Sequence, residues 1–118
     1  MLGAGRDQEA ARRPVIMERH GLRVGLLGFG RTLQAQKDPG VAGFVEWDED
    51  SAVRAVHQLR GTVDVVVVSI HIGFMWIDYP KPAFKQAADR LMQEGAHVVL
   101  MHHAHVLQGY AAGEGRLA

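Results

Sequence analysis

The chain has 118 residues, which fits one modest domain, and its 47% hydrophobic and 22% charged content is that of a globular rather than a disordered protein. Its 13 basic residues equal its 13 acidic ones, which argues against a nucleic-acid partner. The absence of cysteine excludes disulfides and thiolate metal sites, and no apolar run reaches the length of a membrane span.

The first half of the chain is expected to contain two helices and a hairpin. Asp7 can cap a short helix, and Pro14 ends it because the residue before a proline disfavours helix. The glycine of His20-Gly21 tolerates the positive φ of a tight turn between two strands. The expected elements are a helix over 7–11, strands over 15–18 and 22–27, a loop over 31–43 and a helix from Asp48 or Asp50 to about 59.

Two glycine-rich stretches deserve comparison with phosphate-binding loops. GLLGFG, residues 25–30, follows a strand, but it lacks the G-x-G-x-x-G order and opens no helix, so we predict a structural turn there. GAGRD, residues 3–7, also lacks the G-x-G-x-x-G order. Its Arg6 is a candidate contact for a phosphate, and the alternative is an ordinary surface arginine.

The second half of the chain predicts a strand–helix–strand unit. Residues 65–70 are apolar and β-branched almost without alternation, which is typical of a strand covered on both faces. A helix is expected over 83–94, and a second strand of the same kind over 98–101. A βαβ crossover of this kind makes its two strands parallel, so the predicted fold class is α/β. The Gly-Glu-Gly sequence at 113–115 is a turn with which one more hairpin could begin.

Histidines follow both of these strands. His71 ends the first strand, and His102, His103 and His105 end the second. Parallel strands end at the same edge of a sheet, which is where open α/β sheets place their ligands. We therefore expect His71 to converge with His103 and His105 at one edge.

The spacing of the histidines is compatible with a metal site. In an extended chain His103 and His105 leave on one face, and a histidine from the neighbouring strand would complete a plausible ligand set. Neutral imidazole suits Zn, Fe, Mn or Ni. No nearby carboxylate is well placed, because Asp64 lies at the opposite strand end and Asp78 in a loop. The alternative is a solvated loop whose histidines bind nothing. Gln108 either hydrogen-bonds near the metal or caps the loop.

Three segments of the chain share their order and spacing with a known family. They are GAGRDQEAARRPVIMERHGLRVGLLGF, DVVVVSIHIG and VVLMHHAHVLQGYAAGEGRL. They resemble the CapA-type poly-γ-glutamate capsule biosynthesis proteins of the calcineurin-like metallophosphoesterase superfamily. The family pattern G-H-H-P-H-V-L-Q matches at its three histidines, with Met101 at the glycine and Ala104 at the proline. The pattern H-W-G-x-E matches at His71 and Gly73, whereas Met75 stands at the glutamate.

This resemblance implies a portion of a four-layer α/β/β/α sandwich, with the βαβ unit at its core and two divalent metal ions (Mn, Zn or Fe) at the strand ends. Such paired metals clamp a phosphate-like group and activate a water molecule. The candidate site residues are His71, His103 and His105 as metal ligands, His102 as a catalytic proton donor or a substitute ligand, and Arg6 and Gln108 as substrate-binding residues.

The chain also departs from the family. The acidic and Asn-His motifs of the family's first half are absent, as is its final S-L-G-N-F-like segment, so we interpret residues 1–118 as a partial domain. The predicted function is that of a metallophosphoesterase-like capsule biosynthesis protein of the bacterial cell envelope, acting on a phosphate-containing or polyglutamate-related substrate. The alternatives are a non-catalytic metal- or ligand-binding module and an inactive remnant. Strands that are apolar on both faces, with little to cover them, predict self-association and a poorly stable monomer.

Overall fold

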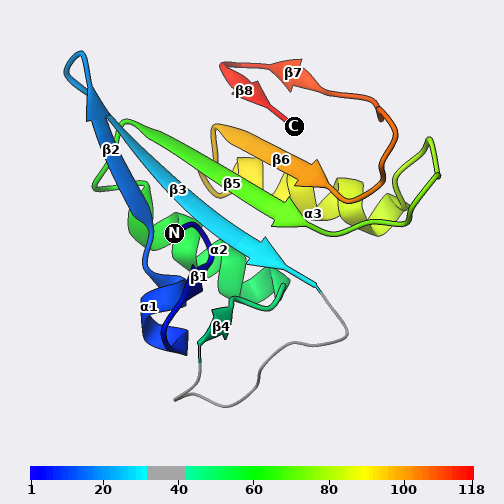
Figure 1. The fold of residues 1–118 in the computed structure, drawn as a ribbon. Helices are drawn as coiled ribbons and strands as arrows, with labels where there is room; N and C mark the ends of the chain where they lie inside the picture. The colour runs from blue at the N-terminus through cyan, green and yellow to red at the C-terminus, as the bar shows by residue number, and fades with distance from the viewer. Residues whose placement is uncertain (32–41) are drawn as a thin grey trace.

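A computed structural model describes residues 1–31 and 42–118 and shows a mixed α/β fold (Figure 1). Within these residues the main sheet has six strands in the order β2-β3-β5-β6-β8-β7. The strands are β2 (Val15–Arg19), β3 (Leu22–Gly30), β5 (Val65–His71), β6 (Val98–His102), β7 (Ala112–Gly113) and β8 (Arg116–Leu117). The helices are α1 (Gln8–Arg12), α2 (Glu49–Leu59) and α3 (Pro82–Gln93). Strands β1 (Ala4–Gly5) and β4 (Gly43–Phe44) pair in a small antiparallel sheet.

The expected strand–helix–strand unit is confirmed. β5 and β6 are parallel neighbours, and α3 connects them. β3 is also parallel to β5 and is connected to it through α2, which adds a second unit of the same kind that the sequence did not predict. The centre of the sheet is therefore three parallel strands whose carboxyl ends lie at one edge.

The helices and the hairpin of the first half are confirmed to within a few residues. The Asp7 carboxylate accepts a hydrogen bond from the Ala10 backbone N–H at 2.7 Å and so caps α1. Asp48 caps α2 in the same way, through the backbone N–H of Ser51 at 2.8 Å. At the hairpin turn His20 and Gly21 have φ of 53° and 80°. The loop expected over 31–43 falls largely outside the described residues, and its last residue begins β4.

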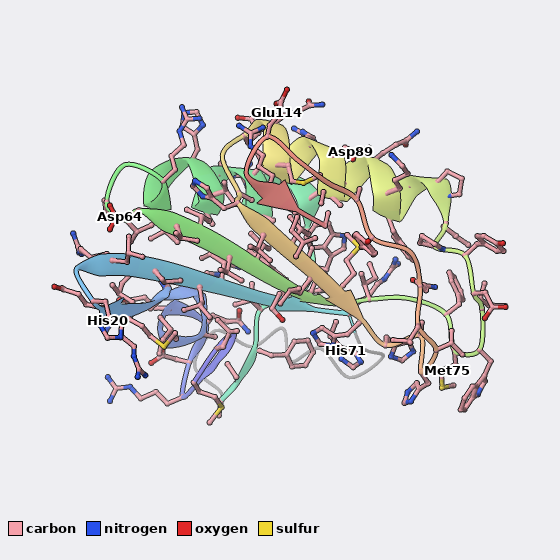
Figure 2. The ribbon with its side chains drawn as sticks, turned by 90° about the horizontal axis from the view of Figure 1, so that it is seen from above. His20, Asp64, His71, Met75, Asp89 and Glu114 are labelled. Carbon is pink, nitrogen blue, oxygen red and sulfur yellow. The ribbon has the colours of Figure 1, made fainter. Side chains whose placement is uncertain are left out.

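Both long helices cover the same face of the main sheet (Figures 1 and 2). The side chains of β5 that point to that face are Val66, Val68 and Ile70, and each has none of its surface exposed. They pack into one core with Val56 of α2 and Leu91 of α3. This core fixes which side of each central strand faces inward.

The opposite face of the sheet is only partly covered, as expected for strands that are apolar on both faces in a chain with little to cover them. Along β5, buried residues alternate with half-buried ones. The sequence is apolar on both sides, but α2 and α3 occupy only one of them. The strand register places a second set of apolar side chains on the other side of the sheet, which we call the open sheet face. Its residues are Met17, Leu22, Val24, Leu26, Val65, Val67, Val98, Leu100 and Leu117.

GLLGFG is not a turn. Residues 25–30 continue strand β3 to its end, so our turn prediction is wrong. The glycines serve close packing instead: a Cβ on Gly25 would lie 2.8 Å from the Leu59 side chain, and one on Gly28 would lie 2.9 Å from the Gly3 backbone nitrogen. The N-terminal segment crosses the strand at Gly28, where it covers part of the open sheet face.

The C-terminal residues complete the sheet. The turn predicted at 113–115 closes a hairpin of β7 and β8, and β8 pairs in parallel with β6 through Val98 and Leu117. None of the helices in the described residues combines the length and apolar character needed to cross a bilayer.

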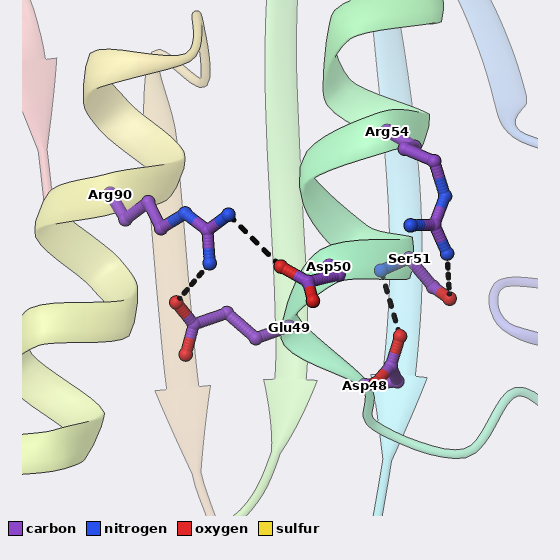
Figure 3. Close-up of polar contacts among 6 residues, drawn as sticks. All are labelled: Asp48, Glu49, Asp50, Ser51, Arg54 and Arg90. Atoms are coloured by element: carbon purple, nitrogen blue, oxygen red, sulfur yellow. Dashed lines mark hydrogen bonds and ion pairs between the residues drawn. The ribbon is translucent and has the colours of Figure 1, made fainter.

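An ion-pair network joins the two long helices (Figure 3). The Arg90 guanidinium of α3 contacts the Glu49 carboxylate at 2.8 Å and the Asp50 carboxylate at 2.9 Å, both on α2. Hydrogen bonds to these two carboxylates raise the pKa of Arg90 above its usual value. The network aligns the first turn of α2 with the last turns of α3, although its exposed position limits its contribution to stability.

We expect Gly3→Ala to destabilise the fold by about 1–3 kcal/mol, because it combines two penalties. Gly3 has φ of 66°, and an added Cβ would lie 2.6 Å from the Gly28 carbonyl oxygen. Urea unfolding measures the change. Gly61→Ala is the control, since a Cβ there meets nothing within 4 Å. Equal losses in the two variants would contradict the close crossing of Gly3 and Gly28.

We expect the purified chain to self-associate through the open sheet face, and Leu100→Lys to reduce that association. The Leu100 side chain is 48% exposed at the centre of this face, and a lysine there would resist burial. Sedimentation velocity over a range of concentrations gives the readout. Ile77→Lys is the matched control, because Ile77 is 51% exposed but lies outside the sheet. A monomer at all concentrations would refute the expectation.

Candidate functional site

The carboxyl ends of β5 and β6 place two histidines side by side. His71 ends β5, His102 ends β6, and the two are direct partners in the parallel register. The Ile72 N–H donates to the His102 carbonyl oxygen at 2.9 Å, which extends the pairing one step past the strands. Paired residues point to the same side of a sheet, so both imidazoles leave on the side of the open sheet face.

Four imidazoles gather at this edge, and we call His71, His102, His103 and His105 the histidine cluster. His71 Nε2 lies 2.9 Å from His103 Nδ1, and His71 Nδ1 lies 3.1 Å from His102 Nδ1. The ring centroids of His103 and His105 are 5.8 Å apart. The expected convergence of His71, His103 and His105 is therefore confirmed as geometry. Figure 2 shows His71 at the far end of the sheet from His20, with Met75 beyond it.

The backbone of this edge is strained. Trp76, His103 and His105 have φ of 64°, 133° and 59°, in the region that side chains other than glycine rarely adopt. Each such residue costs on the order of 1–3 kcal/mol and persists only where the surrounding structure imposes it. Strain of this kind gathers at functional sites more often than elsewhere, so it is independent support for a site here.

The segments that follow β5 and β6 contact each other next to the histidine cluster. The Trp76 N–H donates to the Ala104 carbonyl oxygen at 2.8 Å, and the Trp76 ring lies 5.6 Å from that of His105. The Gln108 side-chain amide donates to the Ile77 carbonyl oxygen at 2.7 Å. Gln108 thus ties the segment after β6 to the segment after β5, and its predicted role in substrate binding stays a prediction.

The nitrogen positions suit a metal ion held by two imidazoles. Two ligands at about 2.0–2.1 Å from one tetrahedral Zn ion lie roughly 3.3 Å apart. His71 Nε2 and His103 Nδ1 lie 2.9 Å apart at hydrogen-bond distance, so an ion between them requires the rings to separate slightly and the shared proton to leave. A complete ligand set is not preformed: no group of three or more His, Cys, Asp or Glu side chains among residues 1–31 and 42–118 is arranged to hold an ion. The residues therefore fit part of one metal site.

The surroundings of His71 disfavour its charged form. Partial burial lowers the pKa of His71 below its ordinary value, and the neighbouring His102, His103 and His105 lower it further. A depressed pKa favours the uncharged ring at neutral pH, and only an uncharged ring offers a lone pair to a metal.

The other predicted residues lie apart from the cluster. The Arg6 guanidinium is 89% exposed and pairs with the Asp7 carboxylate at 3.4 Å, so its phosphate contact remains a prediction. Asp64 lies at the opposite strand end, as expected, where its carboxylate accepts from the Arg23 backbone N–H. His57 approaches Glu94 at 3.4 Å, and His97 accepts from the Val66 N–H at 3.1 Å.

Sequence reasoning missed one polar residue of the site. Ser69 lies on β5 two residues before His71, and its hydroxyl oxygen is 3.1 Å from His102 Nε2. The signal was present: Ser69 is the polar residue in an otherwise apolar strand, and a spacing of two places it on the same side as His71.

The two hollows described in the structure lie away from the histidine cluster. A hollow of about 320 Å³ lies between α3 and the C-terminal hairpin, and one of about 210 Å³ lies beside α1 and α2. Neither is lined by a histidine. The chemistry of the imidazoles, and not the size of a cavity, therefore identifies the candidate site.

Comparison with known proteins identifies the family of the chain. Residues 1–117 match the family described as "Bacterial capsule synthesis protein PGA_cap". The chain is 26% identical over 118 residues to "Capsule biosynthesis protein CapA" of Bacillus anthracis, an alignment that covers 92% of this chain and 28% of that protein. It is 27% identical over 114 residues to "PGA biosynthesis protein CapA" of Bacillus subtilis (strain 168), covering 92% and 29%. The chain thus spans less than a third of these curated relatives, and it belongs to the PGA_cap family of bacterial capsule synthesis proteins.

Proposed function

We propose that the chain supplies the histidine ligands of a divalent metal site that acts on a phosphate-type group during capsule polymer synthesis at the cell envelope. The observation that carries the proposal is the meeting of His71 and His103 ring nitrogens at 2.9 Å, at the ends of adjacent parallel strands. Membership of the capsule synthesis family supplies the biological setting. The substrate class is a phosphate-containing or polyglutamate-related molecule.

In this proposal the ring nitrogens of His71 and His103 bind the ion, whereas those of His102 do not. His71 Nε2 and His103 Nδ1 would hold the ion, and His105, whose ring centroid is 5.8 Å from that of His103, is the next candidate ligand. A bound Mn, Zn or Fe ion would supply Lewis-acid polarisation of a phosphoryl oxygen and a water of lowered pKa. Both His102 nitrogens already face Ser69 and His71, which argues against the proton-donor role predicted for His102.

Carboxylates are the missing part of a two-metal centre. Two dications held close together need anionic ligands to offset their charge, and the described residues bring no Asp or Glu side chain into a metal-holding group. Met75 occupies the position at which the resembling family pattern has a glutamate, and it lies beyond His71 at the same end of the sheet (Figure 2). We propose that the carboxylates of an active centre come from outside residues 1–31 and 42–118.

The second candidate function is a non-catalytic module that binds one metal ion or ligand. The observation that favours it is the same absence of a carboxylate-containing metal group among the described residues. The two candidates differ in what happens to a phosphate group. A phosphoesterase-like site holds a phosphate mimic in a metal-dependent way, whereas a simple metal-binding module has no such requirement.

We expect the chain to bind Zn²⁺ or Mn²⁺ weakly, and His103→Ala to weaken that binding by about tenfold or more, because it removes a ligand nitrogen. Isothermal titration with each metal gives the affinity. His57→Ala is the control, since the His57 ring contacts Glu94 and lies outside the cluster. Unchanged affinity in His103→Ala, with or without His105→Ala, would refute the assignment of ligands.

We expect the metal-loaded chain to bind phenylphosphonate, a phosphate-ester mimic, but to show no hydrolysis of a generic phosphodiester or phosphomonoester. The imidazoles can hold an ion that contacts a phosphoryl oxygen, but without carboxylates they do not assemble two ions. Titration with and without metal tests binding, and a chromogenic assay tests turnover. If the metal-loaded chain does not bind phenylphosphonate, the non-catalytic module is favoured. Robust metal-dependent turnover would show that the missing carboxylates are not needed.

A further inference from the structure

Ser69, His102, His71 and His103 form a continuous chain of polar contacts. Ser69 Oγ lies 3.1 Å from His102 Nε2, His102 Nδ1 lies 3.1 Å from His71 Nδ1, and His71 Nε2 lies 2.9 Å from His103 Nδ1. The strand register builds this chain, because Ser69 and His71 are two apart on β5 and His102 is the direct partner of His71 on β6. Every ring nitrogen of His71 and His102 is thus in contact with a polar neighbour.

Proton counting allows two arrangements of this chain. A neutral imidazole carries one N–H, so one of its nitrogens donates and the other accepts. In the first arrangement His71 Nδ1–H donates to His102 Nδ1, and His102 Nε2–H donates to the Ser69 hydroxyl oxygen. His71 Nε2 then accepts from His103 Nδ1–H, and an ion held by these two nitrogens requires His103 to carry its proton on Nε2 instead. In the second arrangement every donor is reversed, and His71 Nε2 carries the proton and cannot bind a metal.

We propose that Ser69 and His102 are positioning residues that select the first arrangement and so hold His71 Nε2 as a lone pair directed at His103. This inference rests on the proposed metal site and deepens it. Ser69 acts as the terminal acceptor, and His102 transmits its effect without touching the ion. Metal-binding histidines commonly donate their second N–H to such a partner, which fixes both the tautomer and the ring orientation.

Among the described residues the ring nitrogens of His71 have two polar neighbours, His103 at Nε2 and His102 at Nδ1. His71 and His102 rings meet edge to face, at 81° and 4.9 Å between centroids, and His71 and His103 rings meet at 73° with the same separation. The rings are exposed, so water competes for each nitrogen. An exposed ring that keeps one orientation needs a partner on its non-ligating nitrogen, and His102 supplies it.

The test follows the tautomer directly in the full 118-residue chain. Long-range ¹H–¹⁵N spectra of ¹⁵N-histidine protein report which nitrogen of His71 carries the proton, before and after addition of Zn²⁺. We expect the Nδ1–H form of His71 and the Nε2–H form of His102 in both states. Ser69→Ala should mix the tautomers of His71 and weaken Zn²⁺ binding by about tenfold, the usual effect of losing such a partner.

Conservative variants separate positioning from folding and from direct ligation. Ser69→Thr keeps the hydroxyl and should retain the wild-type tautomer and affinity, while Ser51→Ala, a serine on α2, should change neither. His102→Gln keeps an acceptor for His71 Nδ1–H, so it should bind Zn²⁺ far better than His103→Ala. Amide spectra of each variant confirm that it is folded.

The outcomes distinguish this inference from the proposed function. An Nε2–H tautomer of His71 in the wild type, or a Ser69→Ala variant with unchanged tautomer and affinity, would overturn the positioning role. A loss of Zn²⁺ affinity in His102→Gln as large as that in His103→Ala would overturn it too, by making His102 a ligand. If the predicted tautomers appear and respond to Ser69→Ala but the wild type binds no metal, the positioning role stands and the proposed metal site fails.

Discussion

The candidate site depends on the parallel register of β5 and β6. The pairing sets His71 against His102 and Ile70 against Met101, and alternation then sends the imidazoles to one side of the sheet and Ile70 to the other. Ile70, with none of its surface exposed, is held under the helices by the core. A slip of one residue would place an imidazole in that core and move Ile70 into solvent. Hydrophobic burial on one side of the sheet thus fixes the polar chemistry on the other.

The same constraint explains the two kinds of histidine in the cluster. His71 and His102 end regular strands, and their backbones are set by ladder hydrogen bonds. His103 and His105 follow in irregular backbone with positive φ, which costs free energy that the surrounding contacts must offset. The bonds from Ile72 N–H to His102 and from Trp76 N–H to Ala104 join the two loops that would otherwise relax. The two kinds of histidine contact each other where His71 Nε2 approaches His103 Nδ1.

Much of this arrangement could be predicted from the sequence, because its causes are local. The apolar runs at 65–70 and 98–101, with a helix between them, were sufficient to predict parallel strands and the convergence of the histidines. The parallel pairing of β3 was not predictable in this way, because GLLGFG suggests a turn. Its strand conformation depends on Leu59 and Gly3, which are distant in sequence and pack where the glycines leave room. Local pattern cannot reveal contacts of this type.

The contacts of Ser69 show a further limit of sequence reasoning. A serine within VVVVSIH is readily noticed, and alternation places it on the side of His71, but the residue it contacts lies on another strand and depends on register. Register in turn depends on the buried side of the sheet, where Val68 pairs with Val99. The polar chain from Ser69 to His103 is therefore a consequence of apolar packing. The open sheet face has the same origin, since helices that cover only one side leave the other side free both for the imidazoles and for apolar association.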